Sequence, residues 1–107
     1  MEESFDINKV PMPEKPLKQR ISTYVGHHGG NYSEWYIGLT SDPEMALFDV
    51  HNVRRRRGMY RHFRATEPYI ARRVKRYYVE KGMCNGIRAD IDHSGIYVYR
   101  ITEGTVQ

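Results

Sequence analysis

The spacing of apolar residues predicts a helix followed by a strand in the first part of the chain. Within residues 17–25, "LKQRISTYV", apolar side chains recur every three or four positions, which is the period of an amphipathic helix. The glycines of "GHHGGN" end that helix. Residues 33–40, "SEWYIGLT", are rich in aromatic and branched side chains and favour a strand.

A second helix is expected directly after this strand. Ser41 or Asp42 can cap it, Pro43 suits its first position, and it should run to about His51. Residues 59–65, "MYRHFRA", then alternate in the manner of a strand.

The last third of the chain predicts one more helix and one more strand. Thr66 can cap a helix with Pro68 in its first turn, and Gly82 ends it. The apolar stripe of this helix consists of Ile70, Val74, Tyr77 and Tyr78. The segment "GIYVYRIT", which begins at Gly95, reads as the last strand.

The order of these elements predicts an α+β fold, with a small three-stranded, mostly antiparallel sheet flanked by three helices. The 107 residues suit one domain, which we place at residues 17–107. Residues 1–16 contain three prolines and are expected to form a flexible N-terminal arm.

The composition favours a cytoplasmic protein that does not cross a membrane. No apolar run approaches membrane-spanning length, and the N-terminal "MEESFDINKV" is unlike a secretion signal. The single cysteine, Cys84, cannot form an internal disulfide, which suits a reducing compartment.

Positive charge is concentrated in one part of the chain. Ten of the seventeen lysines and arginines lie between Arg54 and Arg76, with Glu67 as the only acid in that window. Such a concentration indicates a surface that binds nucleic acid or an acidic protein. The expected binding residues are Arg54, Arg55, Arg56, Arg57, Arg61, Arg72, Arg73, Lys75 and Arg76.

The stretch Tyr36-Ile37-Gly38, followed by "LTSDPE", resembles the second half of the motif that names the GIY-YIG nuclease family. The first half, Gly-Ile-Tyr, does not precede it at the family's spacing. It appears instead at Gly95-Ile96-Tyr97, in the last strand. We therefore expect this strand to pair beside the Tyr36 strand, in a permuted order.

The resemblance implies a phosphodiester-cleaving site. In the family, tyrosines and a histidine move protons, an arginine neutralises charge developing on the phosphate, and a helical glutamate holds one divalent metal ion. Carried over, the tyrosines would be Tyr36 and Tyr97, and the histidine would be His51.

Two positions depart from the family pattern. The arginine position is Ala46, and the glutamate position on the last helix is Lys75. An alanine cannot bond a phosphate, and a lysine repels a metal ion. The chain therefore reads as a catalytically degenerate domain with a remnant site of Tyr36, Tyr97, His51, Ala46 and Lys75.

No cofactor is expected under this interpretation. Magnesium or manganese would be required only if the domain were an active nuclease. A metal cluster built from His27, His28, Asp90, Asp92 and His93 matches no known ligand spacing, and we predict no metal site.

Three functions remain open from the sequence. The first is a nucleic-acid-binding pseudo-nuclease that uses the Arg-rich loop and helix. The second is a phage-type inhibitor, such as an anti-CRISPR or anti-restriction protein, that binds a nucleic-acid-processing enzyme. The third is an active metal-dependent endonuclease with rearranged catalytic residues. The first is our main hypothesis.

Overall fold

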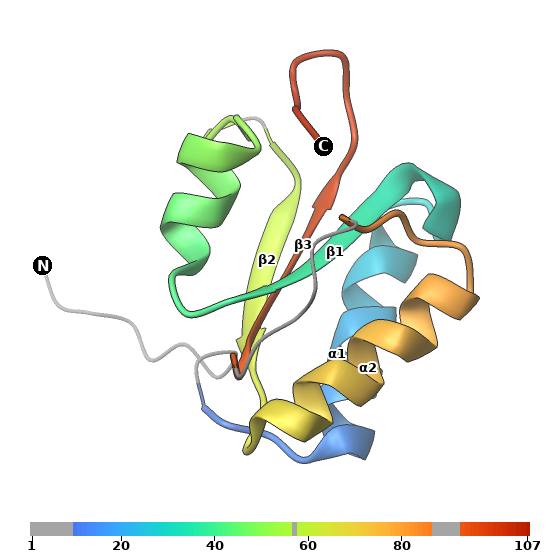
Figure 1. The fold of residues 1–107 in the computed structure, drawn as a ribbon. Coiled ribbons are helices and arrows are strands. Elements are labelled where there is room, and N and C mark those ends of the chain that lie inside the picture. The colour runs from blue at the N-terminus through green and yellow to red at the C-terminus, as the bar shows by residue number, and fades with distance from the viewer. Residues whose placement is uncertain (1–9, 57, 87–92) are drawn as a thin grey trace, which may run out of the picture.

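A computed structural model describes residues 10–56, 58–86 and 93–107 (Figure 1). Its elements, in chain order, are α1 (Glu14–His27), the short 3₁₀ helix η2 (Tyr32–Glu34), β1 (Trp35–Thr40), the π-helix η3 (Met45–Val50), β2 (Tyr60–Arg64), α2 (Pro68–Glu80) and β3 (Gly95–Arg100).

The three strands form one antiparallel sheet in the order β1-β3-β2. The last strand of the chain is therefore the central one, as Figure 1 shows. It pairs with β1 so that Gly38 lies opposite Tyr97 and Tyr36 lies opposite Tyr99. The predicted α+β class, with a three-stranded antiparallel sheet and three helices, is confirmed, and so is the pairing of the C-terminal strand beside the Tyr36 strand.

The sheet has a buried layer on each face, because successive side chains of a strand point to opposite sides. One layer contains Trp35, Ile37, Ile96 and Val98 and packs against the apolar faces of α1 and α2. The other layer contains Tyr36, Tyr97 and Tyr99 together with Ala46, Leu47 and Val53 from η3 and the segment after it. The sheet is thus the middle of three layers.

The first helix begins earlier than predicted. It starts at Glu14 rather than residue 17, with Pro13 at the N-cap. Pro16 lies in the first turn, where the missing N–H costs no helical hydrogen bond. Met12 is buried, and its N–H donates to the carbonyl of Arg64 at 2.9 Å. Residues 12–16 therefore belong to the domain rather than to an arm, and residues 1–9 lie outside the described residues.

The second helix occupies the predicted position but is wound differently. Asp42 caps it, since its Oδ1 accepts a hydrogen bond from the N–H of Met45 at 3.1 Å. The N–H of His51 then donates to the carbonyl of Ala46, five residues back, at 3.0 Å. This spacing defines a π-helical turn, a form that is rare and is often found at functional sites.

The start of α2 also differs from the prediction in detail. Glu67, not Thr66, is the N-cap residue, and no side chain caps the helix there. Gly82 ends the helix region as predicted, with a φ of 119° that favours glycine.

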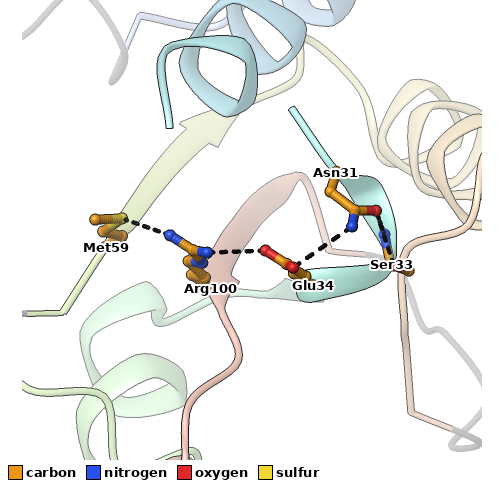
Figure 2. Close-up of polar contacts among 5 residues, drawn as sticks. All are labelled: Asn31, Ser33, Glu34, Met59 and Arg100. Atoms are coloured by element: carbon orange, nitrogen blue, oxygen red, sulfur yellow. Dashed lines mark hydrogen bonds and ion pairs between the residues drawn. The ribbon is translucent and has the colours of Figure 1, made fainter. Parts of the chain in front are cut away.

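A chain of polar contacts links segments at one end of the sheet (Figure 2). Arg100, at the end of β3, contacts Glu34 through Nη2 at 2.9 Å and the sulfur of Met59 through Nη1 at 3.9 Å. Glu34 also accepts from Asn31 at 3.4 Å. Arg100 therefore links the segments that precede β1 and β2, on either side of the central strand.

Candidate functional site

The sheet face beneath η3 brings together three of the residues expected in the remnant site. Nε2 of His51 lies 2.8 Å from the hydroxyl of Tyr97. The ring of Tyr36 lies 4.6 Å from the His51 ring and 6.1 Å from the Tyr97 ring, centroid to centroid. The two halves of the motif, separated by nearly sixty residues of sequence, thus share one cluster.

Tyr99 is a fourth member of this cluster that the sequence interpretation missed. Its ring stacks on Tyr36 at 5.0 Å, and its hydroxyl lies 3.1 Å from Nδ1 of His51. Burial raises the pKa of Tyr99 above its ordinary value, and the neighbouring Tyr36 and Cys84 raise it further. Tyr99 is therefore held as the neutral phenol. The alternation of β3 was the available signal, since Tyr97 and Tyr99 must lie on the same sheet face.

The segment after β3 closes over the cluster. The carbonyl of Val106 lies 2.6 Å from Nδ1 of His51, and the N–H of Val106 donates to the carbonyl of His51 at 2.8 Å. Asn52 donates to the carbonyl of Gly104 at 2.9 Å. Both ring nitrogens of His51 are thereby engaged within the domain.

This cluster is a packed part of the core. Tyr36, Tyr97 and His51 are each 5% exposed, and Tyr99 is fully buried. A phosphodiester reaching them would have to displace η3 or residues 101–107. The hydrogen bonds of His51 join the end of η3 to Tyr97 and Tyr99 of β3 and to Val106.

The two departures from the family pattern lie in different places. Ala46 is buried in the same layer as Tyr36 and Tyr97. Lys75 belongs to α2, on the helix face that is buried with Ala71, Val74 and Tyr78. That face packs on the other side of the sheet, so Lys75 is not brought together with Tyr36, Tyr97 and His51.

The expected binding surface requires one correction. Lys75 was predicted to add to the positive face of the last helix, but it is only 8% exposed, because it lies on the packed side of α2. The other described arginines of the prediction are exposed: Arg54, Arg55, Arg56, Arg61, Arg72, Arg73 and Arg76. Arg57 lies outside the described residues.

These exposed arginines do not form one continuous surface. Arg54, Arg55 and Arg56 lie before β2, next to η3, whereas α2 begins beyond the other end of β2 and covers the opposite face of the sheet (Figure 1). Arg73 on α2 is also paired with Glu14 of α1 at 2.8 Å. The loop and α2 are therefore two separate basic surfaces.

A groove between α1 and β2 is a further basic feature, which the sequence interpretation missed. It has a volume of about 550 Å³, and its lining includes Arg20, Tyr24, His27, His28 and Arg61. These residues come from two segments more than thirty positions apart, so only the packing of α1 on the edge strand brings them together.

The possible metal ligands do not form a site in the described part of the chain. Among residues 10–56, 58–86 and 93–107, no three His, Cys, Asp or Glu side chains are grouped so that they would hold a metal ion. Asp90 and Asp92 lie outside these residues. Within the same ranges, no helix has both the length and the apolar character needed to span a bilayer.

No protein-family model, curated protein or solved structure matches this chain.

Proposed function

We propose that this chain is a nucleic-acid-binding module built on a catalytically degenerate, GIY-YIG-like scaffold. The observation that carries this proposal is the exposure of Arg54, Arg55 and Arg56 side by side in one short loop, close to the buried Tyr36–Tyr97–His51 cluster. Arginine side chains suit phosphate because their planar donors bond two oxygens at once.

Arg54 and Arg55 are held in place by three contacts. The hydroxyl of Tyr60 donates to the carbonyl of Arg55 at 2.9 Å, and the N–H of Gly58 donates to the carbonyl of Arg54 at 2.8 Å. The guanidinium of Arg55 lies 3.9 Å from the centre of the Phe48 ring. Side chains and backbone that are fixed before binding lose less conformational entropy when they bind.

The buried cluster supports the absence of cutting in this proposal. A nuclease needs a group that neutralises charge on the phosphate, and removal of one such group costs roughly a hundredfold to a thousandfold in rate. Ala46 supplies no such group, and the side chains around it are packed against one another. Binding through the surface arginines does not depend on access to this layer.

The test uses labelled single- and double-stranded DNA and RNA, with and without magnesium or manganese, and scores retardation and cleavage on one gel. The test variant is the triple Arg54→Ala/Arg55→Ala/Arg56→Ala. Its matched control is the triple Arg72→Ala/Arg73→Ala/Arg76→Ala, which removes the same charge from α2. We expect retardation without cleavage, and a larger loss of affinity from the loop triple than from the α2 triple.

Two other outcomes would replace the proposal. Metal-dependent products that disappear in Tyr36→Phe would make the protein a nuclease. Neither retardation nor cleavage would favour the inhibitor hypothesis, and a protein partner would then be sought.

A further inference from the structure

The groove between α1 and β2 has the charge of an anion-binding surface. Arg20 of α1 and Arg61 of β2 line it, and His27 and His28 lie at the C-terminal end of α1. No acidic residue is among the described residues that line the groove. The carbonyl end of a helix disfavours anions, so the attraction must come from the side chains rather than from the helix dipole.

Aromatic rings line the same groove. Arg61 lies over the Tyr24 ring, with its guanidinium carbon 4.7 Å from the ring centre. The ring of His28 meets Tyr24 edge to face at 4.7 Å, and Trp35 packs behind Tyr24 at 5.5 Å. The hydroxyl of Tyr24 donates to the carbonyl of Tyr60 at 3.1 Å. These contacts fix Tyr24 and hold the Arg61 guanidinium over its ring.

The groove is connected to the arginine loop. Tyr24 bonds Tyr60, and Tyr60 in turn bonds the carbonyl of Arg55. The loop therefore lies next to the end of the groove where β2 begins. A chain that contacts Arg54–Arg56 would pass around the edge strand β2 to reach Arg61 and Arg20, because the loop adjoins η3 whereas α1 packs on the other face of the sheet.

We infer that this groove binds an unpaired nucleic-acid strand, with its phosphates on Arg20 and Arg61 and its bases against the His28 ring and the Arg61 guanidinium that covers Tyr24. Proteins that hold single strands combine a positive groove along the backbone with aromatic rings on which bases stack. A volume of about 550 Å³ is that of a small-ligand pocket, so the groove can hold a short piece of one strand but not a duplex. The inference rests on the proposed function and specifies the site and the substrate class.

The first test is site-directed. The variant Arg20→Ala/Arg61→Ala is compared with Arg72→Ala/Arg76→Ala, which removes two positive charges from α2. Both are titrated with fluorescent ten-nucleotide oligo-dT and oligo-U, which distinguish DNA from RNA, and with a duplex. We expect the groove variant to bind the better oligonucleotide at least about tenfold more weakly than wild type, as for a lost charge-assisted hydrogen bond.

The dependence on salt gives a second readout. Each lost phosphate contact should reduce the slope of log affinity against log salt by about one for a duplex, and by slightly less for a single strand. The groove variant should therefore lose more than one unit of slope, whereas the α2 variant should retain the wild-type slope. Equal slopes and affinities in the two variants would overturn the inference.

Mapping on the wild-type protein avoids any dependence on the fold of a variant. On titration with the oligonucleotide, the largest amide chemical-shift changes should fall in residues 19–28 and 60–63. Changes confined to residues 53–58 would refute binding in the groove but leave the proposed function intact. If the wild-type protein bound no nucleic acid, the proposed function itself would be refuted.

Discussion

The phenol ring of Tyr97 occupies the space that a side chain at Gly38 would need. The two residues are opposite each other in the β1–β3 pair, and a Cβ placed on Gly38 would overlap the ring and hydroxyl of Tyr97. The glycine of "YIG" and the tyrosine of "GIY" are therefore one structural unit. Close packing alone therefore explains why a glycine and a tyrosine occupy these two positions, whether or not either takes part in catalysis.

Replacing this glycine should destabilise the domain. We expect Gly38→Ala to lower the free energy of unfolding by about 1–3 kcal/mol, since overpacking forces the Tyr97 ring from its place. Chemical denaturation followed by circular dichroism measures this change.

The matched control for that variant is Gly26→Ala. Gly26 lies in α1, and a Cβ there meets nothing within 4 Å, so the change should stabilise the helix by up to about 1 kcal/mol. An equal effect of the two substitutions would contradict the overlap.

Removal of the His51 ring should also weaken the fold. His51→Ala takes a hydrogen-bond partner from the buried hydroxyls of Tyr97 and Tyr99 and leaves a cavity. We expect a loss of about 2–4 kcal/mol in the free energy of unfolding. His27→Ala, at an exposed position, should stay within about 0.5 kcal/mol of wild type. A His51→Ala protein as stable as wild type would show that the hydrogen bonds of His51 to Tyr97 and Tyr99 do not stabilise the packing of η3 on the sheet.

Alkaline pH should destabilise the protein through Tyr78. Burial is the main cause that raises the pKa of Tyr78 from its ordinary value of 10.0 to about 12. Above pH 10 the unfolded chain releases this proton while the folded chain retains it, so stability falls as pH rises toward 12. The pKa values of Tyr99 and Tyr24 are also raised by burial and act in the same direction.

The variant Tyr78→Phe isolates this contribution. It loses hydrogen bonds to the carbonyl of Lys18 at 2.7 Å and to Ser22 at 2.6 Å, which should cost about 1 kcal/mol at neutral pH. Between pH 10 and 12 its stability should fall less steeply than that of wild type. Tyr69→Phe, at an exposed position, is the control. Parallel pH curves for Tyr78→Phe and wild type would refute the assignment.

The ion pair of Arg100 with Glu34 in Figure 2 should contribute little to the free energy of unfolding, despite its short distance. The side chain of Arg100 is 37% exposed and that of Glu34 is 46% exposed, so water and salt screen their attraction. Glu34→Gln should cost less than about 1 kcal/mol, and the cost should shrink at high salt. A loss as large as that expected for His51→Ala would mean that this polar chain governs the end of the sheet.

The sequence predicted the local elements well, because their signals are local. The aromatic strand at residues 35–40, the cap at Asp42 and the end of the last helix near Gly82 follow from side-chain periodicity and turn chemistry. The pairing of the last strand beside the first came from the resemblance of two short motifs, not from periodicity.

The remaining features depend on contacts between distant segments. Lys75 lies between Val74 and Tyr78 at a helical position that could be buried or exposed. It is buried because this side of α2 packs on the sheet. The groove needs Arg20 and Arg61 on neighbouring elements. The early start of α1 escapes prediction because prolines usually break helices, although the first turn tolerates them.

The central position of β3 has a consequence for how the protein is made. During synthesis β1 and β2 emerge long before their common partner, and neither can pair with the other across the place that β3 fills. Both strands therefore expose unpaired edges until residues 95–100 have left the ribosome, and such edges promote association between nascent chains. Folding of the sheet is in this sense a single late event, in which one strand completes two ladders and two core layers together.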